Sequence, residues 1–101
     1  MDEIENSELT PDQIPGPDAG WWAISDFALT YDGYVKHPNE ECALIANERR
    51  HETLDDLRTC LFYEQRRWHW QDELPSGEYL KYFRFLVRAI REKVENRNTN
   101  S

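Results

Sequence analysis

The chain has 101 residues and carries 20 Asp and Glu against 12 Lys and Arg, for a formal net charge of −8. This length predicts one domain, and the lack of any run of about 18 apolar residues predicts no transmembrane helix and no membrane partner. The acidic first ten residues lack the basic and then apolar pattern of a signal peptide, so we expect a cytoplasmic protein.

The acidic charge is concentrated near the N-terminus. Residues 1–35 contain eight acids and no Lys or Arg, whereas residues 36–101 contain 12 acids and all 12 bases. Residues 1–19 also have few apolar side chains and contain three prolines, which predicts a disordered acidic arm. Residues 97–101 form a polar tail. We therefore expect residues 20–96 to form a single small globular domain.

The segment 21–36 has strand character. Phe27, Leu29 and Tyr31 alternate with small or polar residues, and an Asp32-Gly33 dipeptide follows, which is typical of a tight hairpin turn. An isolated hairpin is barely stable in water. We therefore predict a β-hairpin that packs on the rest of the domain or pairs with a second chain.

Three helices are predicted after the hairpin. The first opens at Pro38-Asn39, with the Asn as a possible cap, and runs to about His51. The second begins at Thr53, whose spacing to Asp56 resembles a capping box. The third spans about 76–95, where apolar residues follow a strict 3-4-3-4 spacing: Leu80, Phe83, Val87, Ile90 and Val94.

The predicted fold class is mainly α, a three-helix arrangement with the N-terminal β-hairpin packed on it. If dimerisation extends the hairpin, the class becomes α+β. Cys42 and Cys60 fall on the first two helices, one on each, and are expected to act as small core residues.

A row of basic residues runs beside the apolar stripe of the third predicted helix. Lys81, Arg84, Arg88 and Arg91 repeat at 3-4-3 spacing and therefore share one face. This basic ridge is either a docking strip for an acidic partner or nucleic acid, or a solvated helix face. A further hypothesis is that the acidic arm folds back over the ridge until a partner displaces it.

Aromatic and basic residues also cluster near the end of the second predicted helix. Successive residues of a helix are rotated by about 100°, so Trp68 and Trp70, two positions apart, cannot both face the same core. An exposed Trp beside Arg66 and Arg67 has the composition of an interface anchor. The alternative is that the hairpin covers Trp70, with one of its tyrosines stacked on the indole.

Glu64 occupies a position on the second predicted helix where the spacing calls for an apolar residue. A buried carboxylate needs a partner, and the third helix offers Arg84, Arg88 and Arg91. We favour this interhelical ion pair over a general base with a raised pKa, because no nucleophile or second acid accompanies Glu64.

The sequence indicates no catalytic residues, no metal site and no cofactor. Glu48 and His51 have the spacing of half a di-iron ligand set, but a second copy is missing. His51 is instead expected to stabilise the C-terminal end of the first helix. A body of about 75 residues also leaves little room for a pocket of the usual size, so we do not expect an enzyme.

The functional expectation is a small protein-interaction module that binds a protein partner, or a second copy of itself, through its aromatic and Arg-rich surface. The expected site residues are Lys81, Arg84, Arg88, Arg91, Arg66, Arg67, Trp68 and Trp70. Two alternatives stay open. The chain could be an acidic nucleic-acid mimic or an inhibitor of a nucleic-acid-binding protein, or it could bind nucleic acid directly through the basic ridge, although its overall charge disfavours a nucleic-acid partner.

Overall fold

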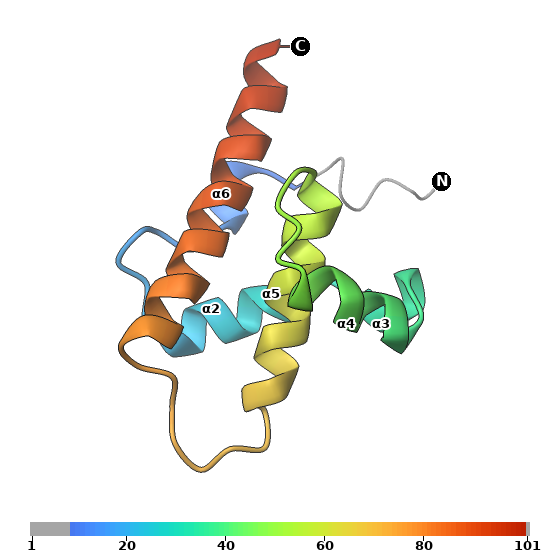
Figure 1. Cartoon of the computed structure of the whole chain (residues 1–101). Helices are drawn as coiled ribbons and strands as arrows, with labels where there is room; N and C mark the ends of the chain where they lie inside the picture. The colour runs from blue at the N-terminus through green and yellow to red at the C-terminus, as the bar shows by residue number, and fades with distance from the viewer. Residues whose placement is uncertain (1–8, 101) are drawn as a thin grey trace.

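A computed structural model describes residues 9–100 of the chain, with the side chains of residues 9–96. This part of the protein is helical and contains no strand (Figure 1). The elements in chain order are a 3-10 helix η1 (Pro11–Gln13), α2 (Trp21–Ala28), the short α3 (Gly33–Lys36), α4 (Asn39–Asn47), α5 (Leu54–Trp68) and α6 (Glu78–Asn100).

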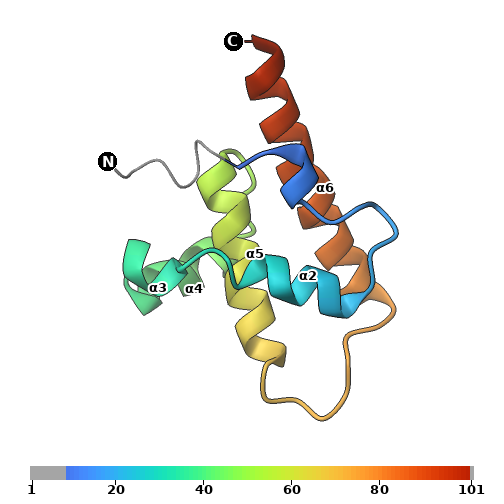
Figure 2. The same ribbon diagram turned by 180° about the vertical axis from the view of Figure 1, so that it is seen from behind.

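The two longest helices, α5 and α6, run in opposite directions and are joined by the loop 69–77 (Figure 1). On one side, α2 crosses and contacts both of them (Figure 2). On the flank of α5 lie α4 and α3. The core is formed where these helices meet, by Ile24 of α2, Leu57 and Leu61 of α5, and Leu86 and Ile90 of α6, all of them at most 1% exposed.

The second and third predicted helices are confirmed. Thr53 is the N-cap of α5, and its hydroxyl oxygen accepts a hydrogen bond from the backbone N–H of Asp56 at 3.0 Å. In α6, Phe83, Val87, Ile90 and Val94 of the predicted stripe are buried, and Leu80 is partly buried. Burial of this stripe against α5 and α2 stabilises α6 and attaches it to the rest of the domain.

The β-hairpin predicted for residues 21–36 is wrong, because this segment is helical. Trp21, Ile24 and Phe27 lie three positions apart, Ala28 lies four positions after Ile24, and all four are buried on one side of α2. The alternation that continues to Tyr31 resembled a strand. A period of two and a period of 3.6 cannot be separated over so few residues, and packing across α5 and α6 selects the helix.

Gly33 begins α3 instead of forming a hairpin turn. A Cβ at this position would lie 2.6 Å from Cδ2 of Phe62, so the α3 backbone approaches the aromatic ring of α5 more closely than any side chain allows. The ring of Phe62 is in turn held edge-on by Tyr34 at 4.9 Å between centroids. The glycine is therefore needed for close packing and not for a positive φ angle.

A polar network ties the segment around α3 to α4 and α5. His37 Nε2 lies 2.8 Å from Asp55 Oδ2, and His37 Nδ1 lies 3.3 Å from Glu41 Oε1. The hydroxyl of Tyr31 donates a hydrogen bond to Oδ1 of the same Asp55. Burial lowers the pKa of His37, but the hydrogen bonds and negative charges of Asp55 and Glu41 outweigh it and raise the pKa above the ordinary 6.5.

The residues before α2 lie along α6. Leu9 and Ile14 are buried in the core. The guanidinium of Arg91 donates hydrogen bonds to the carbonyls of Ile14 and Pro15 at 2.8 and 3.1 Å. These contacts concern residues 9–19 of the predicted acidic arm, whereas residues 1–8 lie outside the described part. Among the helices of the described chain, none is long and apolar enough to cross a bilayer.

Candidate functional site

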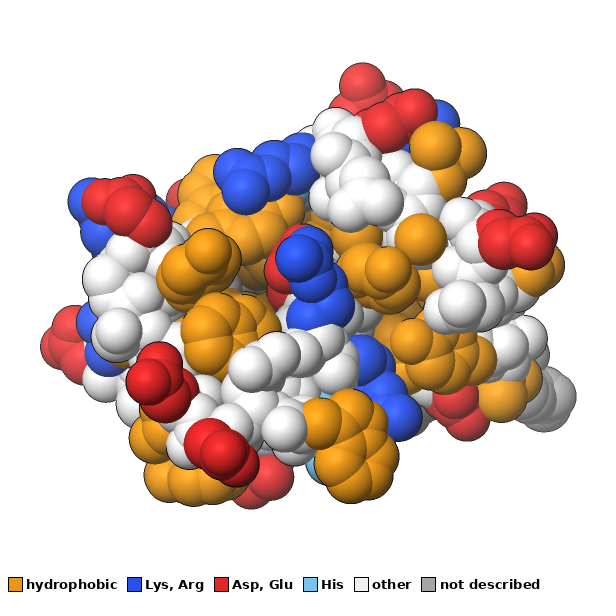
Figure 3. Space-filling view, turned by 60° about the horizontal axis from the view of Figure 1, so that its bottom comes forward, with side chains coloured by type: hydrophobic (Ala, Val, Ile, Leu, Met, Phe, Trp, Pro, Cys, Tyr) orange, Lys and Arg blue, Asp and Glu red, His pale blue; other side chains and the backbone are white. Residues whose placement is uncertain are grey.

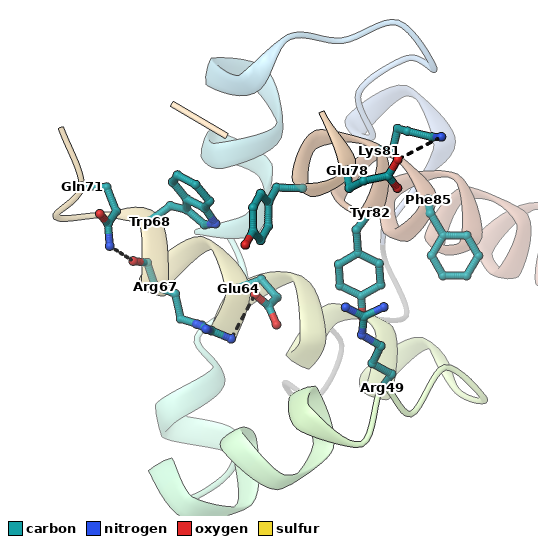
Figure 4. Close-up of a pocket in the computed structure, with 10 residues that line it drawn as sticks. Arg49, Glu64, Arg67, Trp68, Gln71, Glu78, Lys81, Tyr82 and Phe85 are labelled. Carbon is teal, nitrogen blue, oxygen red and sulfur yellow. Dashed lines mark hydrogen bonds and ion pairs between the residues drawn. The ribbon is translucent and has the colours of Figure 1, made fainter. Parts of the chain in front are cut away.

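A cleft lies between the C-terminal half of α5 and the N-terminal half of α6 (Figure 4). Its volume is about 960 Å³, so the expectation that so small a body leaves little room for a pocket is wrong. The residues that line this α5–α6 cleft are Arg49, Glu64, Arg67, Trp68, Gln71, Glu78, Tyr79, Lys81, Tyr82 and Phe85.

Aromatic side chains form the walls of the α5–α6 cleft. The ring of Trp68 on α5 meets that of Tyr79 on α6 edge-on, with centroids 5.2 Å apart. Further along α6, Tyr82 and Phe85 are stacked with centroids 6.1 Å apart. Tyr79 is 63% exposed and Phe85 is 41% exposed, so these walls are open to solvent. Figure 3 shows hydrophobic side chains interleaved with Lys and Arg side chains across this end of the molecule.

Three cations border the α5–α6 cleft. Arg67 on α5 lies 3.6 Å from the carboxylate of Glu64, and Lys81 on α6 lies 3.6 Å from that of Glu78. The third is Arg49, from the loop between α4 and α5, whose guanidinium lies over the ring of Tyr82 at 4.3 Å. The cleft therefore holds more positive than negative side chains, in a chain whose net charge is −8.

Glu64 lies at the bottom of the α5–α6 cleft, and its side chain is only 15% exposed. In Figure 4, Arg67 reaches the carboxylate of Glu64 from one side, and the guanidinium of Arg49 lies on the other side, over the ring of Tyr82. Burial raises the pKa of Glu64, and the positive charges of Arg67 and Arg49 offset this only in part. The predicted ion pair with an arginine of α6 is wrong, because the partner within 4 Å is Arg67, one turn away on α5 itself.

Arg49 has an unusual backbone conformation. Its φ angle is +53°, and it follows the C-cap of α4. The N–H of Arg49 bonds to the carbonyl of Ala46, and the N–H of Arg50 bonds to that of Ile45, which together form a Schellman motif. Glycine is the usual residue at this left-handed position, so an arginine here is held at a backbone cost.

Of the expected site residues, the structure brings three into the α5–α6 cleft: Arg67, Trp68 and Lys81. Trp70, in the loop after α5, is 80% exposed. The alternative that a tyrosine of residues 21–36 stacks on Trp70 is wrong, because the rings of Tyr31 and Tyr34 pack on Phe62. Arg66 and Arg88 lie on α5 and α6 outside the lining of the cleft.

The basic ridge is not one continuous free strip. Arg84 donates to the carbonyl of Ala19 at 3.2 and 3.3 Å, and Arg91 donates to the carbonyls of Ile14 and Pro15, directly after η1. The segment before α2 does lie over the basic ridge, but in these contacts its backbone carbonyls, and not its acidic side chains, accept from the arginines. Arg88 remains exposed between the two.

Sequence reasoning missed Arg49, Tyr79, Tyr82 and Phe85 as members of one site. Tyr79 directly precedes Leu80 of the apolar stripe and is exposed. Tyr82 and Phe85 lie beside the apolar stripe of α6 in the sequence, which places them at the edge of its buried face. No signal in the sequence indicates that Arg49, 33 residues before Tyr82, reaches the same surface.

His51, expected at the end of the first helix, lies beyond α4 and contacts α6. Its Nε2 is 3.0 Å from the hydroxyl oxygen of Tyr82, and its ring packs edge-on against Phe85. Burial and the neighbouring Arg49 lower the pKa of His51. Glu48 bonds instead to Arg50. Among the described residues, no three His, Cys, Asp or Glu side chains are grouped as a metal ion requires.

The two cysteines are free and buried, as expected for core residues. Burial raises the pKa of the Cys60 thiol to about 12 and also raises that of Cys42. Both therefore remain neutral thiols near pH 7, which does not suit a nucleophile.

Comparison with known proteins assigns no relative: no family model, no curated protein and no solved structure matches this chain significantly.

Proposed function

We propose that this chain is a small protein-interaction module that binds a segment of a partner protein in the α5–α6 cleft. The observation that carries the proposal is the cleft itself, in which the aromatic walls of Trp68, Tyr79 and Phe85 stand beside the cations Arg49 and Arg67. Tryptophan, tyrosine and arginine are the residue types that dominate the energy of protein interfaces. The proposal assigns the cleft a binding role and no catalytic step.

The alternatives receive less support from these contacts. Direct nucleic-acid binding through the basic ridge would require cations that point to solvent, yet Arg84 and Arg91 are engaged with backbone carbonyls. A nucleic-acid mimic would array its carboxylates over the folded surface, and eight of the 20 acids fall instead in residues 1–35. We place the protein in the cytoplasm, and the two free, buried thiols of Cys42 and Cys60 support a reducing compartment.

A site-specific photo-crosslink tests the proposal. A benzophenone amino acid replaces Tyr79 in the full chain, and a matched variant carries it at Glu92, which is exposed on α6 outside the cleft. After irradiation in an extract of the native cells, we expect a defined protein adduct at position 79 that is absent at position 92. Equal labelling at both positions, or no adduct at position 79, would overturn the proposal.

A further inference from the structure

We propose that the α5–α6 cleft binds an acidic segment of the partner protein, and that a carboxylate of this segment takes the place beside Arg67 and Arg49 that Glu64 now holds. The inference rests on the proposed function, because it names the chemistry of the partner that the cleft receives. It makes Glu64 an internal competitor of the ligand and not a part of the recognition surface.

The first support is that the cations of the cleft are only loosely engaged. The 3.6 Å between Arg67 and Glu64 exceeds the roughly 2.7–2.9 Å of a strong charge-assisted hydrogen bond, and the Arg67 side chain is 59% exposed. Lys81 and Glu78 are also 3.6 Å apart, and both are largely in solvent. Such exposed pairs contribute little stability, so Arg67 and Lys81 can change partner at small cost.

The second support is the position of Glu64. Its carboxylate lies between the two guanidinium groups (Figure 4), but burial disfavours its charge more than the arginines favour it. If Glu64 binds a proton or turns away, Arg67 loses its carboxylate partner and the positive charge of Arg49 loses the nearby negative charge of Glu64. An incoming carboxylate that stays partly in solvent would then be a better partner for both.

The third support is the backbone at Arg49. Glycine would hold a φ of +53° with less strain, so the left-handed backbone at this position does not require an arginine side chain. That guanidinium lies over Tyr82 at 4.3 Å, which fixes it at the edge of the cleft. Replacement by glycine removes the cation and relaxes the loop, which makes Arg49 a clean position for a test.

The walls of the cleft add a second requirement to the ligand. Trp68, Tyr79 and Phe85 offer aromatic surface next to the cations, so the fitting segment carries an apolar side chain beside its acid. A nucleic acid fits less well. Glu64 and Glu78 stand in the same cleft, and the chain has a net charge of −8, which repels a polyanion but tolerates one or two carboxylates.

Binding of two matched hexapeptides to the full chain tests the inference. In the first, acidic residues flank a Leu-Phe pair, and in the second each acid is replaced by its amide. Both are labelled and followed by fluorescence anisotropy at low salt. We expect the acidic peptide to bind at least about tenfold more tightly than the amide peptide.

Four variants then locate the site. We expect Arg67→Gln and Arg49→Gly to weaken binding of the acidic peptide about three- to tenfold, and Glu64→Gln to tighten it about twofold or more. Arg88→Gln is the matched control, because this exposed arginine of α6 lies outside the cleft, and it should change nothing. Circular dichroism melts confirm that each variant is folded.

Several outcomes overturn the inference. These are equal binding of the two peptides, no binding of either, weaker binding of Glu64→Gln, a loss in Arg88→Gln equal to that in Arg67→Gln, or tighter binding of a single-stranded oligonucleotide. Sedimentation that depends on protein concentration and is abolished by Arg67→Gln would instead identify a second copy as the occupant. A crosslink at position 79 together with a failed peptide test rejects the acidic ligand alone, whereas failure of both rejects the interaction module as well.

Discussion

Replacement of Gly33 by alanine tests the packing of α3 against α5. In the structure a Cβ at Gly33 would lie 2.6, 2.9 and 3.2 Å from three ring atoms of Phe62, whereas carbon atoms in contact are normally about 3.5–4.0 Å apart. The ring cannot withdraw freely, because Phe62 is 5% exposed and Tyr34 holds it edge-on. The alanine must therefore displace a packed aromatic side chain by about an ångström.

The expected cost follows from two opposing terms. Overpacking of a buried site costs about 1–3 kcal/mol, whereas replacement of a glycine in a helix by alanine gains about 0.5–1 kcal/mol. We therefore expect Gly33→Ala to lower the free energy of unfolding by up to about 2.5 kcal/mol, which lowers Tm by up to about 20 °C in a domain of this size. Urea titration and thermal melts followed by circular dichroism measure both quantities.

Two further variants make the result specific. Gly16→Ala is the matched control, because a Cβ there meets nothing within 4 Å, and it should leave Tm unchanged or slightly raised. In a Phe62→Leu background the clash is relieved, so Gly33→Ala should cost less than in the parent chain. If Gly33→Ala melted at or above the parent while Gly16→Ala behaved as expected, the close approach of α3 to Phe62 would be refuted.

Four other predictions concern stability. Val87→Asp places an unpaired charge at a position that is 3% exposed and should abolish the cooperative melt, whereas Arg88→Asp on the exposed side of α6 should melt nearly as the parent does. The pKa of His37 is raised in the folded state, so protonated His37 contributes fully to the free energy of unfolding below pH 6.5. This contribution is lost as the pH rises through the raised folded pKa. Urea titrations across this pH range should show that loss in the parent and not in His37→Gln. The pKa of His51 is lowered, so the parent should gain stability as the pH rises from the lowered folded value through 6.5, and His51→Gln should abolish that gain. Gln65 is 2% exposed and its Nε2 donates a buried hydrogen bond to Ser25 Oγ at 3.0 Å, so Gln65→Met should leave that hydroxyl without its partner and lower the free energy of unfolding by about 1–3 kcal/mol; an unchanged Tm would contradict this.

The elements that local signals specify could be predicted from the sequence. The cap at Thr53 acts over three residues, and the apolar stripe of α6 repeats over five positions, so neither depends on the rest of the chain. Trp68 packs against the core and Trp70 is 80% exposed, as predicted, but the helical reasoning does not explain it, because α5 ends at Trp68 and Trp70 lies in the loop.

The predictions for residues 21–36 failed where the local signal was short or had two physical explanations. Gly33 was interpreted as the turn residue of a hairpin, but the structure uses its missing side chain to bring α3 onto Phe62. Similarly, α2 has only eight residues, too few for periodicity to separate helix from strand. In both cases tertiary contacts decide the conformation.

The candidate site shows the same division. Arg67, Trp68 and Lys81 were selected from composition and helix spacing, and they do line the α5–α6 cleft. Arg84 and Arg91 were selected by the same rule, but backbone carbonyls before α2 occupy their guanidinium groups. Spacing along a helix shows which side chains share a face, but not which neighbouring segment covers that face.

The sequence by itself determined the two long helices, the cap that begins α5 and the concentration of acidic charge in the first third of the chain. Only the tertiary structure decided that 21–28 is a helix across α5 and α6, and that Arg49 lines the same cleft as Arg67 and Glu64. The reason is physical. Capping and periodicity act between residues a few positions apart, whereas the α5–α6 cleft depends on how a loop and two helices pack, and that packing is a property of the whole core.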